Sequence, residues 1–134
     1  MKLGIKRTRI KRSPKSQARK RQISELDGLL RQHVLERDGN VCVRCGRYPP
    51  TCVLQSAHVL SKGPASRLRF EPDNLMSLCI ACHIFFWHKS PHEAVAWFNE
   101  KYPGRYERLQ IAARCAPKLD LKLLLAVWRH GVKP

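Results

Sequence analysis

Two Cys-x-x-Cys pairs dominate the middle of this 134-residue chain, Cys42 with Cys45 and Cys79 with Cys82. Each pair can supply two thiolates to one tetrahedral zinc ion, so the four cysteines predict a closed structural zinc site. Disulfides are the alternative, but the tight spacing is typical of zinc. Residues 1–22 lack the apolar run of a secretory signal, which favours a reducing compartment. A zinc ion would hold together a segment too short to bury a sufficient core.

Three further residues beside these pairs have side chains that can do chemistry: His58, Asn74 and His83. A histidine can take a proton from water near neutral pH, and a neutral imidazole can also bind a divalent cation. Taken singly, each residue has a structural alternative. His58 could be an ordinary hydrogen-bonded residue of a strand, Asn74 could close a turn, and His83 could belong to the zinc shell. Grouped between two metal-binding pairs, they predict a catalytic site that zinc holds in place.

The order His58, Asn74, His83, with a cysteine pair on each flank, resembles the HNH (ββα-metal) nuclease family over residues 42–98. By this resemblance, His58 is the general base, Asn74 orients the loop that holds His58, and His83 binds a catalytic Mg²⁺ or Mn²⁺. The wider pattern is most similar to small phage HNH proteins of the NinG/Rap recombination type. The features that carry this similarity are an Arg-rich leader, Leu26-Asp27, Arg37-Asp38, Arg69-Phe70-x-Pro72-Asp73-Asn74, and a helix that ends Ala96-Trp97-Phe98.

The residue before the expected base departs from the family's pattern. Many members carry an Asp or a His there that binds the metal, whereas this chain has Ala57, which cannot. His88 is the available substitute, but five residues at about 100° each place it about 140° round a regular helix from His83. Sharing one ion would then require the helix to end early. Because Mg²⁺ keeps several waters, the missing ligand weakens the metal site without excluding catalysis.

The chain is strongly basic, with 26 Lys and Arg against 10 Asp and Glu and a formal net charge of +16. This charge predicts a polyanionic partner. No apolar stretch approaches the ~20 residues that cross a bilayer, so DNA is favoured over a membrane. Residues 1–24 contain no acid, and we expect a disordered arm that follows DNA phosphates, with solubility or localisation as alternative roles. The cations expected to contact phosphates are Arg9, Lys11, Arg12, Arg19, Lys20 and Arg21 in this arm, and Lys62, Arg67 and Arg69 before Asn74.

The apolar patterns predict a small α+β fold: a zinc-stapled ββα-metal (HNH) core with one helix before it and further helices after it. Ser24 is the expected cap of the first helix. The expected strands and helices that follow span residues 53–60, 74–78, 80–89, 92–102, 105–114 and 119–130. We expect three parts: the arm (1–24), the zinc-containing nuclease domain (25–103) and a helical extension (104–134). The extension is expected to pack on the core, with a homodimer interface as the alternative.

These expectations together favour a metal-dependent DNA endonuclease with little sequence specificity. The resemblance implies branched or recombination-intermediate DNA as its substrate. A non-catalytic, zinc-stabilised DNA-binding protein is the alternative, which Ala57 keeps open. An RNA-binding zinc knuckle is less favoured, because Trp87 and Trp97 fall on helical stretches where core packing is expected. The expected location is the cytoplasm of a bacterium or a phage-infected host, in association with the nucleoid.

Overall fold

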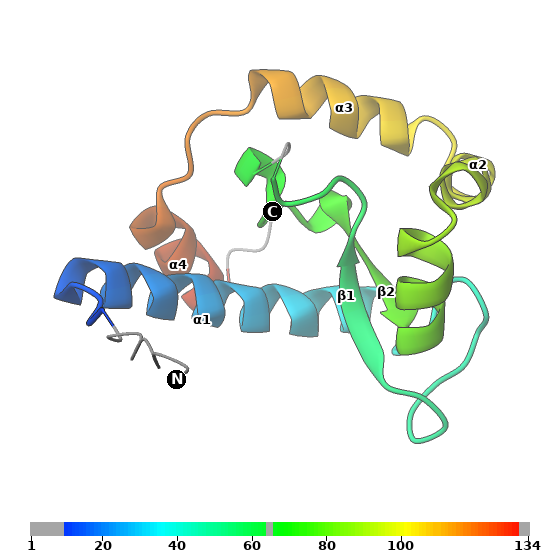
Figure 1. The fold of residues 1–134 in the computed structure, drawn as a ribbon, viewed down its shortest axis with the longest axis horizontal. Coiled ribbons are helices and arrows are strands. Elements are labelled where there is room, and N and C mark those ends of the chain that lie inside the picture. The colour runs from blue at the N-terminus through cyan, green and yellow to red at the C-terminus, as the bar shows by residue number, and fades with distance from the viewer. Residues whose placement is uncertain (1–9, 64–65, 132–134) are drawn as a thin grey trace, which may run out of the picture.

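The computed structural model describes residues 10–63 and 66–131. In this part of the chain, helices surround a small two-stranded antiparallel sheet (Figure 1). The protein is therefore a small α+β domain, as the sequence predicts. Arg9, one of the cations expected to contact DNA, lies outside the described residues, as does the rest of segment 1–9.

The two strands and the helix after them occur in the predicted order of strand, loop, strand and helix. His58 at the end of the first strand faces Leu75 at the start of the second, and Leu54 faces Cys79. The helix that follows is a π-helical turn, entered through Ile80 and Ala81. In chain order the elements are α1 (Pro14–Arg37), β1 (Leu54–His58), the 3-10 turns η1 (Ser66–Leu68) and η2 (Pro72–Asn74), β2 (Leu75–Cys79), the π-turn η3 (Cys82–His88), α2 (Pro91–Lys101), α3 (Arg105–Cys115) and α4 (Leu121–Arg129).

The first helix is longer than the sequence analysis predicts. Ser13 is its cap, with its side-chain oxygen accepting a hydrogen bond from the Ser16 amide at 3.3 Å, and Pro14 occupies the first turn. The prediction that Ser24 caps the helix is wrong, and residues 14–24 are helical where a disordered arm was expected. The reason is that residues 15–24 contain no Gly or Pro and are rich in Lys, Arg and Gln. Such residues extend an already anchored helix at little cost.

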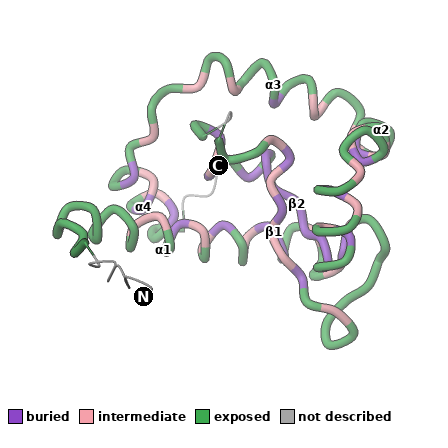
Figure 2. The backbone as a smooth tube through the Cα atoms, in the orientation of Figure 1, coloured by how far each residue is buried: buried purple, intermediate pink, exposed green. Residues whose placement is uncertain are grey.

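Buried side chains form two clusters. The first joins the sheet to η3, α2 and α3, and Phe98 and Trp87 are among its largest members. The second joins α1 to α4 through Leu26, Leu30 and Trp128. Burying each large apolar side chain contributes about 2 kcal/mol, so the C-terminal half of α1 is firmly anchored. The N-terminal half of α1 extends beyond both clusters and is exposed (Figure 2).

Candidate functional site

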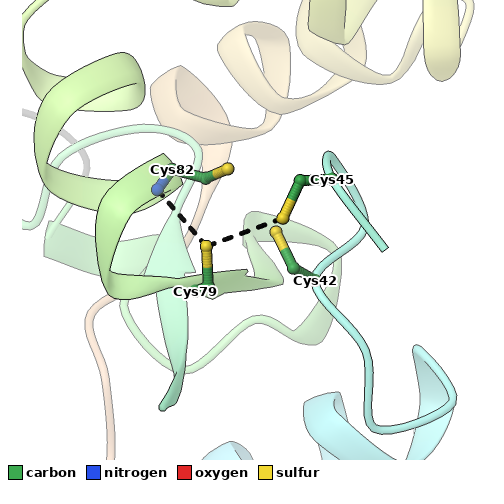
Figure 3. Close-up of side chains that lie close together, drawn as sticks. All are labelled: Cys42, Cys45, Cys79 and Cys82. Atoms are coloured by element: carbon green, nitrogen blue, oxygen red, sulfur yellow. Dashed lines mark hydrogen bonds between the residues drawn. The ribbon is translucent and has the colours of Figure 1, made fainter. Parts of the chain in front are cut away.

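The four cysteines of the two pairs converge at one point of the fold. Cys42 and Cys45 come from the loop after α1, Cys79 ends β2, and Cys82 begins η3 (Figure 3). Their sulfur atoms all lie within 4.8 Å of one another, and the Cys45 and Cys79 sulfurs are 3.7 Å apart. Four thiolates about 2.3 Å from one tetrahedral zinc would be about 3.8 Å apart. The cluster therefore fits a zinc ion, as predicted, and all four thiols are free of disulfides.

The first cysteine pair lies in a tight turn that directs backbone amides at sulfur. Gly46 adopts a φ of +76°, a left-handed conformation that glycine accommodates without strain, and its amide donates to the Cys42 carbonyl at 2.8 Å. Burial raises the pKa of the Cys42 thiol, but hydrogen bonds from the backbone at Cys45, Cys79 and Arg44 outweigh it and lower that pKa to about 7. Amides that stabilise a thiolate also prepare it for a cation.

The second pair is more deeply buried. Cys79 is 2% exposed and accepts a hydrogen bond from the Cys82 amide at 3.5 Å (Figure 3). Burial raises the pKa of Cys82 to about 12, although the Arg44 side chain near its sulfur opposes the shift. Arg44 alone does not offset this shift, so Cys82 would ionise at neutral pH only with a metal ion bound to its sulfur, which agrees with a metal-binding role for the cluster.

A cleft of about 500 Å³ lies between η3, β1 and α1. Three histidines line it: His58 from β1, and His83 and His88 from η3. The structure therefore brings His58 and His83 to one cavity, as the sequence analysis expects of a shared site. The other residues that line the cleft are Asp27, Gly28, Leu30, Arg31, Ser56, Ser61, Lys62, Arg69 and Leu75.

His58 is half-buried at the end of β1, and its surroundings select one tautomer. Its Nε2 lies 3.0 Å from the carbonyl oxygen of Arg69. A carbonyl oxygen can only accept, so Nε2 carries the hydrogen and Nδ1 keeps its lone pair. Burial lowers the pKa of His58, and the charge of Lys62 lowers it further, although the bond to Arg69 opposes both. The ring is therefore held neutral near pH 7, in the form that accepts a proton.

His83 and His88 meet because η3 is a π-turn. Its backbone hydrogen bonds join residues five apart, so side chains with that spacing lie one above the other. The two Nε2 atoms are 3.0 Å apart. Two nitrogens about 2.1 Å from one metal, at a right angle, would also be about 3.0 Å apart. The expectation that His88 lies on a different side of the helix from His83 is therefore wrong, because it assumed α-helical geometry.

Gln55 of β1 orients the His83 ring, a role that the sequence analysis missed. Its side-chain oxygen accepts a hydrogen bond from His83 Nδ1 at 2.7 Å, which leaves the lone pair on Nε2. Such outer partners set the tautomer and direction of metal-binding histidines. Burial also lowers the pKa of His83, helped by the nearby charges of His88 and His58. The sequence indicates this role only through a polar residue that lies between two apolar residues, Leu54 and Ala57, within a strand.

Asn74 is fully buried and ties down the loop that follows His58. Its side-chain oxygen accepts from the Leu60 amide at 2.8 Å, and its Nδ2 donates to the carbonyls of Leu60 and Leu68 at 3.2 Å each. These bonds join the start of the loop to its end. Loop-fixing is the role that the family resemblance implies for this residue, and its contribution to catalysis stays a prediction.

Two arginines, one before Asn74 in the chain and one after it, donate hydrogen bonds to the backbone carbonyls beside Asn74. Arg37 donates to the carbonyls of Pro72 at 2.9 Å and Leu75 at 2.8 Å. Arg105 donates to the carbonyls of Asp73 at 2.7 Å and Leu75 at 2.9 Å. Because these contacts cross 30 or more positions of the chain, composition and spacing could not reveal them. They make the segment that presents Asn74 rigid.

The expected DNA-contacting cations divide between several surfaces. Lys62 and Arg69 line the cleft, and Arg69 also pairs with Asp27 through Nη2 and Oδ2 at 2.7 Å. Arg67 instead donates to the carbonyl of Ala116 at 2.6 Å, in the connection between α3 and α4. Lys11, Arg12, Lys20 and Arg21 line a separate groove on α1, whereas Arg19 lies in another groove beside the start of α4.

The chain matches no family model, no curated protein and no solved structure. Among the described helices, none combines the length and the apolar character needed to cross a membrane. The site must therefore be interpreted from its own geometry. That geometry consists of four cysteines arranged for a structural zinc, with a cleft beside them that places two histidine nitrogens together near a third, neutral histidine.

Proposed function

We propose that this chain is a divalent-metal-dependent DNA endonuclease of the HNH type. The observation that carries this proposal is the composition of the histidine cleft. His58 keeps a lone pair on Nδ1, and the Nε2 atoms of His83 and His88 are spaced for one shared cation. A base and a cation facing one cavity are what hydrolysis of a phosphodiester requires.

In the proposed reaction, His58 Nδ1 takes a proton from water as the water oxygen bonds to phosphorus. The bond from phosphorus to the leaving oxygen of the sugar then breaks. Lys62 and Arg69, which line the cleft, offset the negative charge that grows on the phosphate oxygens. A Mg²⁺ or Mn²⁺ ion held by His83 and His88 would supply further positive charge at the phosphate and the leaving oxygen.

The cysteine cluster has a supporting role in this proposal. Cys82 is adjacent to His83, so zinc bound at the cluster would anchor the first turn of η3 and therefore the histidine pair. Trp87, also in η3, donates a hydrogen bond from Nε1 to the backbone carbonyl of His58 in β1, at 3.0 Å. The base and the cation site are thus joined through the same turn. Positions held this rigidly favour a productive geometry.

DNA is the proposed substrate because the chain carries a net charge of +16 and the cleft is flanked by cations. Contacts from such cations position a phosphate backbone and carry no information about bases. We therefore propose weak sequence specificity, with branched or recombination-intermediate DNA as the favoured shape. Cleavage rates on junctions, flaps and plain duplex test the shape preference, and equal rates on all three would remove it.

A second function remains supported by one observation. Ala57, at the position where a metal-binding residue is expected from the family resemblance, is fully buried and faces away from solvent. The cation site then has two protein ligands, and a protein that binds DNA without cutting it would also fit. Zinc-stabilised DNA binding without catalysis is therefore the alternative proposal.

Plasmid nicking with added Mg²⁺ or Mn²⁺ separates the two functions. The wild type should cut, and His58→Ala should be slower by about 10²- to 10⁴-fold because it loses the base. DNA binding and zinc content should not change. His92→Ala, which removes an exposed histidine of α2, is the matched control and should cut normally. Equal cutting by His58→Ala would rule out His58 as the base, and a wild type that binds but never cuts would favour the alternative.

A further inference from the structure

The N-terminal half of α1 forms a basic groove that leads toward the histidine cleft. The residues that line this groove include Gln17, Lys20, Arg21 and Ser24 of the helix, and Lys11 and Arg12 just before it. These six residues are exposed, and no acidic or aromatic side chain is among the described residues that line the groove. The groove is therefore a surface of one charge, open to a polyanion.

The groove and the cleft share one face of α1. Positions 17, 20, 21 and 24 line the groove, and positions 27, 28 and 31 line the cleft. At about 100° per residue, these seven positions cover about 120° of the helix circumference, and Pro14 of the groove and Leu30 of the cleft widen the face to about 200°. Steps of three and four residues form a continuous stripe along a helix. A ligand that enters the cleft can therefore follow the same face of α1 outward.

The opposite face of α1 leads elsewhere. Lys15 and Arg19 line a groove shared with Lys118 and Lys122 at the start of α4. Farther along the helix, this face becomes the buried contact of Leu26 with α4. Cations on this face are as exposed as those of the basic groove, but they do not lead to the cleft. Removing these cations therefore tests whether the position of a charge matters for DNA binding, or only the number of charges.

We propose that the face of α1 from Gln17 to Arg31, the α1 stripe, binds the backbone of duplex DNA on one side of the cut. This inference rests on the proposed function, because it takes the cleft as the place of cleavage. Lys20 precedes Arg31 by eleven residues, or about 16 Å along the helix axis, which corresponds to about five base pairs. From the start of α1 to Arg31 the distance is about 26 Å, or about eight base pairs.

Duplex is favoured over a single strand for two reasons. A straight helix matches the regular phosphate spacing of a stiff duplex, whereas a flexible strand gains little from a rigid row of cations. Binding of single strands also relies on aromatic side chains that stack on bases, and within residues 10–63 and 66–131 the structure places none in the lining of the groove. The α1 stripe thus adds a requirement for several base pairs of duplex beside the scissile phosphate.

The test compares two charge-matched double variants, each made in the His58→Ala protein. Lys20→Gln with Arg21→Gln removes two charges from the α1 stripe, and Lys15→Gln with Lys122→Gln removes two from the opposite groove. Binding to a 30-base-pair duplex is measured across a range of salt concentrations without added Mg²⁺ or Mn²⁺. Each lost phosphate contact should reduce the slope of log K against log salt by about 0.9, so the stripe variant should lose about 1.8. The control variant should keep the parent slope.

Equal slopes for the two variants would overturn the α1 stripe. So would a loss of the same size in binding to a single strand of equal length, because that result would indicate backbone charge without duplex recognition. Circular dichroism and zinc content verify that α1 and the cysteine cluster remain intact in both variants. Binding is measured without cleavage, so the two proposals can fail separately. A wild type that fails to cut would count against the proposed function. The salt slopes would still show whether the α1 stripe binds duplex DNA.

Discussion

The cysteine cluster and the histidine cleft both include residues of η3 and differ in how far they are closed. Cys42, Cys79 and Cys82 are between 1% and 5% exposed, Cys45 is exposed, and all four sulfurs lie within 4.8 Å of one another. The cleft offers two histidine nitrogens, and His88 is exposed. Structural metal sites are closed by protein ligands, whereas catalytic sites keep positions open for water and substrate. Under the proposed function, one seven-residue turn serves both a closed site and an open one.

Breaking the closed site should have the largest effect. In Cys79→Ser, zinc content should fall from one atom per chain to near zero and cooperative unfolding should be lost, because ligand binding supplies folding free energy at such sites. Metal analysis and thermal unfolding measure both. Cys115→Ser, which replaces an exposed cysteine outside the cluster, should behave like the wild type. A folded, zinc-free Cys79→Ser protein would show that the cluster is not needed for the fold.

Asn74→Ala should weaken the open site through its supporting loop. The change leaves the Leu60 amide and two carbonyls without their partner in a buried position, which should cost about 3 kcal/mol of unfolding free energy. Urea unfolding measures this, and Asn99→Ala on the exposed face of α2 is the control. Zinc content should stay at one atom per chain while nicking falls. An unchanged stability would mean that the loop does not depend on Asn74.

Gln55→Ala and His88→Ala should affect the open site and spare the closed one. The first removes the partner that orients His83, and the second removes a proposed ligand. We expect the Mn²⁺ concentration for half-maximal nicking to rise about 10- to 100-fold, as for lost outer-shell partners at other metal sites. Zinc content and unfolding should match the wild type, with His92→Ala as the control. A normal Mn²⁺ requirement in His88→Ala would remove His88 from the site.

The smallest effect should come from pH. Burial lowers the pKa of His58, so the proton-accepting form is populated at lower pH than in an exposed histidine. Nicking at saturating metal should therefore be near its maximum at pH 7. It should decrease as the pH falls through the lowered pKa, by up to about tenfold per pH unit. A pH–rate profile measures the midpoint, and a midpoint above that of an exposed histidine would contradict the effect of burial.

The closed site could be predicted from the sequence because its chemistry depends on short-range spacing. Two residues between paired cysteines are enough to bring both sulfurs to one ion, and Gly46 marks the turn that allows it. The packing of the last helix is similarly local in origin, because its buried residues Leu121, Leu125 and Trp128 recur at helical spacing. In each case, local periodicity determines which side chains meet.

The open site could be predicted only in part, since tertiary contacts determine its details. The pairing of His83 with His88 depends on a π-turn, which the usual helical period does not anticipate. Gln55 meets His83 across 28 positions of the chain. The start of α1 was placed at Ser24 because the basic segment before it has few apolar residues, yet packing farther along the helix anchors it.

The five-residue separation of His83 and His88 has a consequence for the detection of comparable proteins. Search patterns for helical ligand pairs usually require three intervening positions, the spacing that an α-helix brings together. Here four residues intervene, and the widened turn absorbs the extra one. A motif with Cys-x-x-Cys-His followed by four arbitrary residues and His would capture this arrangement, which patterns built on the ordinary helical repeat would discard.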